Sequence, residues 1–296
     1  MNNDNLRCFR IFRSGITDRS LPLMLGIDEA GRGPVLGPMV YGGFACPIGS
    51  EYRDLLKKEI GVDDSKTLSV VLRQAMFKEL NSPDRPFALS AEIITPKYIS
   101  YKMTRRFVYF VAMLKVLRDD YNLNSISHDS AIALIRHFLS HGFNVKEVYI
   151  DAVGSPAHYE AKLKTLFPDL RCVVATKADS KYPVVSAASI VAKVIRDNMI
   201  ESWYKDTPDS AKVGSGYPGD AVTRDFLASH MDRLFGFSSF VRVSWSTAKI
   251  MLEDKKRAIP FEWYDPDSAT DESQLVKQVR ETQWPPFRTL TNITTL

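Results

Sequence analysis

The 296-residue sequence predicts an α/β protein in which helices flank one mixed β-sheet, with a helical appendage at the C-terminus. Short runs rich in β-branched and apolar residues alternate with longer helical patterns along most of the chain. The first three runs alternate in hydrophobicity or are joined by a glycine-rich turn, as antiparallel strands are. A helix-like stretch separates the last two runs, as in a parallel β–α–β unit. Both kinds of strand pairing are therefore expected in one sheet.

The expected elements follow from these patterns in chain order. Strands are predicted near residues 22–28, 35–46, 87–95, 145–151 and 171–177. Helices are predicted at about 51–60, 69–80, 103–120, 129–141, 156–167, 183–202, 220–231 and 244–257. Ser69 and Asp220 are suited to cap the helices that follow them, and Pro183 is suited to begin another.

Four regions are expected along the chain. They are an N-terminal extension at 1–20, a core at 21–205, a C-terminal helical region at 206–257 and a linker with a tail at 258–296. The extension is polar and loosely held in this interpretation, although Phe9 and Phe12 could pack. The tail is rich in acidic residues, proline and aromatic residues, so a docking role is a hypothesis for it.

Composition excludes several classes of protein. A net charge of +4 is mild, so nucleic-acid binding would require a local basic surface. Cys8, Cys46 and Cys172 lack metal-ligand spacing, and we expect reduced thiols in a cytosolic or nuclear protein. No secretory leader and no membrane span are expected. The serine-hydrolase elbow and the phosphate-binding loop of nucleotide triphosphatases are both missing from the sequence.

The most informative segment is the run from Leu23 to Pro34, in which an apolar stretch stops at Asp28 and Glu29 and continues into a glycine-rich basic turn. Side chains alternate along a strand, so we expect the strand to end at these acids if both are to reach one ligand. Carboxylates suit hard cations such as Mg²⁺ or Mn²⁺. Taken alone, such a pair is more often a solvated strand-end turn than a functional site.

Two further acids follow predicted strands. Asp151 ends one apolar run, and Asp179 lies just beyond the next. Open α/β sheets place their binding sites at the carboxyl ends of strands. The sequence therefore predicts a cation site formed by Asp28, Glu29, Asp151 and Asp179.

The helix after Pro183 carries a polar stripe on an otherwise apolar surface. Its members, Ser186, Ser189, Lys193 and Asp197, recur at helical spacing. For Lys193 and Asp197, an ordinary i,i+4 ion pair is an equally good interpretation. On the helix at 129–141, His137 and His141 could in principle bind zinc, but no third ligand accompanies them and a solvated helix face is preferred.

Five blocks in fixed order resemble the type 2 ribonucleases H. They are GIDEAGRGPVLGPMVYG at 26–42, DDSKTLS at 63–69, YIDAVGS at 149–155, TKADSKYPVVSAASIVAKVIRD at 176–197 and GSGYPGD at 214–220. The resemblance covers about residues 22–257 and is closest to the catalytic subunits of the eukaryotic heterotrimeric enzymes. No acidic position departs from the family pattern.

The resemblance implies a ribonuclease H-like fold, two bound Mg²⁺ or Mn²⁺ ions on the four acids, and two non-catalytic partner subunits. It implies cleavage of the RNA strand in RNA/DNA hybrids and cleavage 5′ of single ribonucleotides in duplex DNA, which leaves 5′-phosphate and 3′-hydroxyl ends. A nuclear role in ribonucleotide and RNA-primer removal is the matching expectation. The residues expected to bind substrate are Gly31, Arg32, Gly33, Lys66, Ser189, Lys193 and Tyr217.

Two other functions remain open from the residues alone. Another two-metal nuclease or integrase on the same fold would share the acids but would not need a 2′-hydroxyl. A non-catalytic hybrid-binding protein is the second alternative, although an intact set of four acids argues against it.

Overall fold

The computed structural model describes residues 9–62, 68–104, 122–205, 213–254 and 256–258, all within the unit that spans Met1–Ala258. Several predictions lie outside these residues. They concern Cys8, Lys66, nearly all of the helix expected at 103–120, and the tail from residue 259 onward. No helix in the described ranges is long and apolar enough to cross a membrane.

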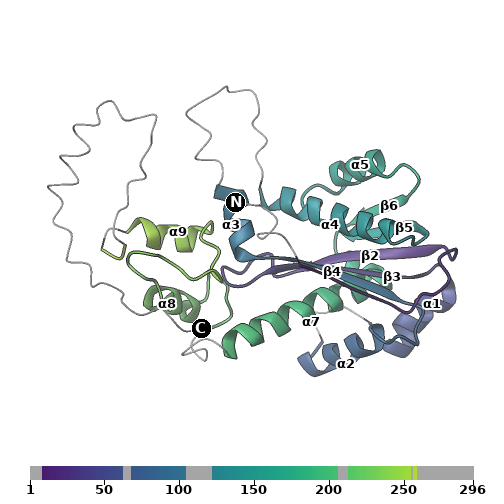
Figure 1. The fold of residues 1–296 in the computed structure, drawn as a ribbon, viewed down its shortest axis with the longest axis horizontal. Helices are drawn as coiled ribbons and strands as arrows, with labels where there is room; N and C mark the ends of the chain where they lie inside the picture. The colour runs from purple at the N-terminus through teal and green to yellow at the C-terminus, as the bar shows by residue number, and fades with distance from the viewer. Residues whose placement is uncertain (1–8, 63–67, 105–121, 206–212, 255, 259–296) are drawn as a thin grey trace, which may run out of the picture. The chain divides into compact units, whose positions relative to one another are not determined.

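A six-stranded mixed sheet forms the centre of the molecule (Figure 1). Its strands are β1 (Phe9–Ser14), β2 (Leu23–Ala30), β3 (Met39–Pro47), β4 (Ala88–Ile94), β5 (Val145–Asp151) and β6 (Arg171–Ala175), in the order β1-β4-β3-β2-β5-β6. The pairs β1/β4, β4/β3 and β3/β2 are antiparallel, whereas β2/β5 and β5/β6 are parallel. The predicted fold class is confirmed, and β2 is the strand at which the pairing changes from antiparallel to parallel.

Strand β1 corrects the expectation of a loosely held N-terminal extension. Six residues, Phe9–Ser14, pair with β4 along one edge of the sheet. The Phe12 ring stacks on His141 at 4.7 Å and meets His137 edge-on at 5.5 Å. Both histidines therefore contact an aromatic ring, while His141 stays exposed on the helix face. The arginines within this run make it look polar in sequence, which hides its role as a strand.

Helices cover both faces of the sheet (Figure 1). One face carries α4 (Leu123–Ser140) and α5 (Pro156–Leu166), and the other carries α2 (Val70–Leu80) and α7 (Pro183–Lys205). Alternation along β2 divides its side chains accordingly, since Leu25 and Ile27 enter the first core and Met24 and Ala30 enter the second. Odd-numbered and even-numbered positions of β2 thus face different helical layers.

Helix α7 packs unusually close to the sheet. A Cβ atom at Gly26 of β2 would collide with the backbone of Val184, and one at Gly42 of β3 would collide with the backbone of Ala188. Glycine at these two positions removes that obstacle. The polar stripe on α7 is thereby brought within reach of the residues at the end of β2.

The other helices include agreements and corrections. Ser69 and Asp220 cap α2 and α8 (Ala221–Ser229) as predicted, and α7 begins at Pro183. Helix α4 begins at Leu123 instead of residue 129, because the Asn122 side chain caps it. The segment after β3 forms α1 (Ser50–Asp54) and a π-helical turn (Leu55–Ile60), and the unpredicted helices are α3 (Pro96–Thr104) and α6 (Ala178–Lys181).

A third apolar cluster lies next to the loop that follows β2. It contains Val35, Leu36, Val213, Phe226, Leu227, Val241 and Ala248, and therefore joins this loop to α8 and α9 (Ser246–Glu253). Trp203 near the end of α7 stacks on Phe240 at 3.8 Å, and both rings pack against this cluster, which connects it to α7. We call this cluster, with α8, α9 and the segment that joins these two helices, the C-terminal layer.

Candidate active site

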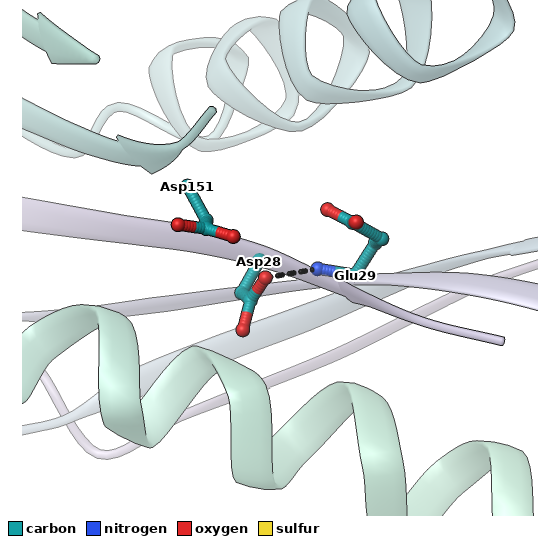
Figure 2. Close-up of side chains that lie close together, drawn as sticks. All are labelled: Asp28, Glu29 and Asp151. Carbon is teal, nitrogen blue, oxygen red and sulfur yellow. Dashed lines mark hydrogen bonds between the residues drawn. The ribbon is translucent and has the colours of Figure 1, made fainter. Parts of the chain in front are cut away.

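Three carboxylates meet where β2 and β5 run side by side. Asp28 and Glu29 lie on β2, and Asp151 is the last residue of β5. One carboxylate oxygen from each lies within 4.8 Å of the others (Figure 2). The parallel register pairs Ile27 with Ile150, so the acids follow directly on two neighbouring strands. This sheet pairing is what brings together residues that are distant in sequence.

The acids do not converge in the way that the sequence suggested. Strand β2 continues to Ala30, so Asp28 and Glu29 project to opposite faces of the sheet. In Figure 2 the Asp28 side chain points toward α7 and the Glu29 side chain points the other way, with Asp151 on the adjacent strand. The three carboxylates therefore come from both faces of the sheet, and β2 does not have to end at Glu29 to bring them together.

Electrostatics make the group suitable for a cation. Asp28 is buried, and its Oδ1 atom accepts the Glu29 amide N–H at 2.7 Å. Burial raises the pKa of Asp28 well above its usual value, and the charge of Glu29 raises it further. The Ser189 side chain opposes this shift through a hydrogen bond to the Asp28 carboxylate. Clustered oxygen donors of this kind fit Mg²⁺ or Mn²⁺, because a divalent ion would offset their mutual repulsion.

Asp179 lies next to this group in the fold but is not one of its three members. It sits on α6, where it is buried and its Oδ1 atom accepts the Ser180 N–H at 3.0 Å. The preceding amide, of Ala178, donates to Asp151 Oδ1 at 2.7 Å. Oxygens of Asp28, Glu29 and Asp151 thus lie close together, and Asp179 lies in the turn whose first amide holds Asp151.

The turn that carries Asp179 has an unusual backbone. Lys177 has a φ of 53°, the only positive value at a non-glycine residue in the described ranges. A side-chain-bearing residue is costly in this conformation, and such residues cluster at functional sites. The Lys177 turn leads directly into the Ala178 amide that holds Asp151, while the Ser186 hydroxyl donates to the Asp179 carbonyl.

The polar stripe on α7 is confirmed and divides into two parts. Ser186 and Ser189 are buried and hold the Asp179 carbonyl and the Asp28 carboxylate. Lys193 and Asp197 form the i,i+4 ion pair that the sequence left open, with Nζ and Oδ1 at 2.8 Å. Arg73 of α2 approaches the same aspartate at 3.7 Å. Lys193 is therefore engaged within the protein, although its side chain keeps some exposure.

The segment Gly31–Arg32–Gly33 follows β2 directly. The Arg32 guanidinium donates to the Ser127 hydroxyl at 2.6 Å and to the Asn124 side chain, so it is bound to α4. Gly31 has a φ of 82°, and a Cβ atom there would collide with the Arg196 side chain. The one long side chain of the loop is thus held by the protein.

Tyr217 lies against this loop. A Cβ atom at Gly33 would sit 3.0 Å from the Tyr217 ring, and the ring remains 52% exposed. The Gly216 carbonyl accepts the Val35 N–H at 2.8 Å, which fixes the tyrosine loop beside the glycine loop. Hydrogen bonds from Ser215 lower the pKa of Asp220 to about 2 and close the turn. The Gly31–Arg32–Gly33 loop and the loop that carries Tyr217, both predicted to bind substrate, therefore lie side by side.

Two residues of the site were missed by the sequence interpretation. The first is Arg242, which is completely buried and donates to backbone carbonyls of the glycine loop, and the second is Trp245. Burial lowers the pKa of Arg242 to about 9, so the side chain stays charged at neutral pH. Their only signal in the sequence is an arginine placed between apolar residues in the run FVRVSW at 240–245.

Known proteins resemble this chain over the same region. A family model described as ribonuclease HII matches residues 25–248. A ribonuclease H2 subunit of Caenorhabditis elegans is 42% identical over 272 residues, which cover 89% of this chain and 84% of that protein. The corresponding ribonuclease H2 subunit of Homo sapiens is 40% identical over 264 residues, which cover 88% and 82%. The crystal structure of the ribonuclease H2 from Pyrococcus horikoshii OT3 has a TM-score of 0.58 and 30% identity, covering 77% of this chain and 96% of that one.

Proposed function

The chain belongs to the ribonuclease HII family, and from this premise we propose that it cleaves duplex DNA on the 5′ side of single embedded ribonucleotides. It is a hydrolytic nuclease of the ribonuclease H type, acting on RNA paired with DNA. The observation that carries the finer proposal is the arrangement of the site. A three-carboxylate group lies at the start of a glycine loop, and an exposed tyrosine ring rests on that loop.

The acidic residues have the chemistry for a divalent-metal site. Asp28, Glu29 and Asp151, with Asp179 as the proposed fourth ligand, would hold two Mg²⁺ or Mn²⁺ ions. When bound, such ions supply an activated water and stabilise the leaving 3′ oxygen, which yields 5′-phosphate and 3′-hydroxyl ends. Hydrogen bonds within the protein fix two of these carboxylates, since the Ala178 amide donates to Asp151 and the Ser189 hydroxyl donates to Asp28.

Selection of the cleavage position requires a reader of the 2′-hydroxyl. This hydroxyl is the one local difference between a ribonucleotide and its DNA neighbours, and it can both donate and accept a hydrogen bond. Backbone groups of Gly31, Arg32 and Gly33 are proposed to bind it. A site built to bond a hydroxyl strongly disfavours a substrate that lacks one. Tyr217, with its ring exposed, is proposed to stack on the following deoxyribose.

Partners and location are part of the same proposal. The relatives in Caenorhabditis elegans and Homo sapiens are named as subunits, so each is one chain of a larger assembly. We propose two non-catalytic partners for this chain, a contribution of residues 258–296 to binding them, and a nuclear role in removing ribonucleotides and RNA primers. Deletion of 258–296 is expected to reduce copurification of the partners, and full recovery of both would contradict the role of the tail.

The function is tested with three matched duplexes that carry one ribonucleotide, none, or a continuous RNA strand. The full chain, alone and with copurified partners, is incubated with each duplex in Mg²⁺ or in EDTA. We expect one cut 5′ of the ribonucleotide, cleavage of the hybrid, and no product from DNA alone or in EDTA. Equal cleavage of the all-DNA duplex would favour a general two-metal nuclease, and no cleavage of any duplex would favour a non-catalytic role.

A further inference from the structure

Three successive backbone carbonyls of the glycine loop are held by the C-terminal layer. The Gly31 carbonyl accepts Arg242 Nη2 at 2.5 Å, and the Arg32 carbonyl accepts Nη1 at 2.9 Å. The Gly33 carbonyl accepts the indole Nε1 of Trp245 at 3.0 Å. The loop is thus fastened along its whole length by two side chains that lie far away in sequence.

Arg242 has further bonds to the same segment. Its Nε atom donates to the Gly37 carbonyl at 2.9 Å, and its own amide donates to the Val35 carbonyl at 2.8 Å. A single guanidinium therefore joins both ends of the connection between β2 and β3. The fixed, planar arrangement of its donors allows this, because several carbonyls can be bonded at defined angles at once.

Arg242 is a buried charge whose lost water is replaced by backbone carbonyls. The side chain is completely buried, and no carboxylate in the described part of the chain forms an ion pair with it. Desolvation of a charge is costly unless hydrogen bonds replace the lost water. Here carbonyl oxygens do so, and the Trp245 ring lies 4.9 Å from the guanidinium carbon. An apolar side chain would fill this space without that cost but would leave the loop carbonyls unbonded.

Peptide geometry determines what this fastening does to the loop amides. In a planar trans peptide, the C=O and N–H bonds point in opposite directions. Because the carbonyls of Gly31 and Arg32 point toward Arg242, the amides of Arg32 and Gly33 point away from it. No acceptor for either amide is found within the described residues. The Gly33 amide is also close to the Tyr217 ring, since the ring lies against that residue.

We propose that Arg242, assisted by Trp245, is a positioning residue for ribonucleotide selection. It aims the Arg32 and Gly33 amides at the substrate by holding the opposite side of the same two peptides. This proposal rests on the proposed function, in which the glycine loop reads the 2′-hydroxyl. It adds that the choice of substrate depends on a buried arginine that touches neither nucleic acid nor the acidic residues.

The test measures binding instead of turnover, so that the loop is separated from the chemistry. The full chain, with its copurified partners if they are retained, binds duplexes that carry one ribonucleotide or none, in Ca²⁺ to suppress cleavage. The ratio of the two dissociation constants is the discrimination factor. In Arg242→Lys the charge remains, but the three donors of an ammonium share one nitrogen and cannot span the Gly31, Arg32 and Gly37 carbonyls as the forked guanidinium does. We expect the discrimination factor to fall about tenfold, with the dissociation constant for all-DNA duplex within about twofold of wild type.

Leu227→Ala is the matched control. Leu227 is fully buried in the same C-terminal layer, so its truncation destabilises that layer without removing a bond to the loop. We expect it to lower the melting temperature while preserving discrimination. Trp245→Phe keeps an aromatic ring and removes only the bond to the Gly33 carbonyl. It should lower discrimination about threefold, and it replaces Arg242→Lys if that variant does not fold.

The outcomes separate this proposal from the proposed function. A wild-type chain that binds both duplexes equally would contradict the function itself. Discrimination by the wild type that persists in Arg242→Lys or in Trp245→Phe would overturn the positioning role alone. An equal loss in Leu227→Ala would also overturn it, because general stability of the layer would then explain the effect.

Discussion

The acidic site and the glycine loop are consecutive in sequence but are built in different ways. The acidic site consists of side chains on β2 and β5, and its geometry follows from parallel strand pairing. The glycine loop consists of backbone groups. Side chains of α4 and of the C-terminal layer bond to it, and the Arg196 side chain of α7 packs against Gly31. The proposed metal ligands are thus side chains on paired strands. The proposed reader of the 2′-hydroxyl is instead a short backbone segment that hydrogen bonds from α4 and from the C-terminal layer hold in place. Variants in the two regions should therefore fail in distinguishable ways.

The largest effect is expected from the acidic site. Asp28→Asn or Asp151→Asn should reduce cleavage of every substrate at least about a thousandfold, because one of the clustered oxygen ligands loses its charge. Cleavage of an RNA/DNA hybrid in Mg²⁺ measures this. Asp129→Asn, an exposed acid on α4, is the control and should remain active. Near wild-type cleavage by either site variant would remove that residue from the acidic site.

A smaller effect is expected in the glycine loop. Gly31→Ala places a side chain at a φ of 82° and 2.7 Å from the Pro38 carbonyl, with the Arg196 side chain also in its way. We expect kcat/KM to fall about five- to thirtyfold on ribonucleotide-containing substrates, since strain of about 1–2 kcal/mol displaces the loop.

The matched control for this variant is Gly142→Ala. Gly142 has a φ of 76° but no atom within 4 Å of its Cβ position, so it tests the cost of strain without a collision. Calorimetric titration with Mn²⁺ should give the same affinity for Gly31→Ala as for wild type. A large loss of Mn²⁺ affinity would mean that the loop and the acidic site are not separable.

These contrasts match what the sequence could and could not predict. The acids follow apolar runs, and this position alone predicted that Asp28, Glu29, Asp151 and Asp179 lie near one another; the structure groups the first three. The opposite directions of Asp28 and Glu29 were not predicted, because a strand that continues past them to Ala30 looks the same in sequence as one that stops. Strand β1 was missed because an edge strand with arginines lacks a continuous apolar pattern.

The residues that hold the glycine loop in place could not be predicted from the sequence, for a different reason. A hydrogen bond from Arg242 to the Gly31 carbonyl connects residues that no spacing rule relates, and a carbonyl acceptor carries no residue-type signal. The fixed position of Arg32 depends similarly on Asn124 and Ser127 of α4. Side-chain ligands can be inferred from composition and spacing, but backbone geometry imposed by distant residues requires coordinates.

The acidic site should also reveal itself in the stability of the metal-free protein. Burial raises the pKa of Asp28 in the folded state, so its contribution to stability is present below its unfolded pKa and is lost as pH rises through the folded value. At neutral pH in EDTA, Asp28→Asn should therefore melt about 2–4 °C higher than wild type. The gain should disappear near pH 4 and reverse when Mg²⁺ is added. A lower melting temperature at neutral pH in EDTA would contradict the cost of burying the Asp28 charge beside Glu29.

The smallest effect concerns Lys66, which belongs to the DDSKTLS block and lies outside the described residues. If this lysine contacts a substrate phosphate, Lys66→Ala should weaken binding of all duplexes similarly. The slope of log affinity against log salt should fall by about one unit, because one counterion fewer is released. Lys78→Ala on α2 is a charge-matched control. An unchanged slope would leave Lys66 without a role in binding.

The most direct test of the division between catalysis and selection is the Tyr217 substrate ratio. It is the kcat/KM on a single embedded ribonucleotide divided by the kcat/KM on a continuous RNA/DNA hybrid, compared among wild type, Tyr217→Phe and Tyr217→Ala. The exposed ring rests on Gly33 and does not touch the acids, and stacking on a sugar or base contributes about 1–3 kcal/mol. We expect Tyr217→Ala to lower the ratio about ten- to a hundredfold, with Tyr217→Phe retaining most of it. Equal losses on both substrates, leaving the ratio unchanged, would contradict the assignment of selection to Tyr217 and leave it to the Gly31–Arg32–Gly33 loop alone.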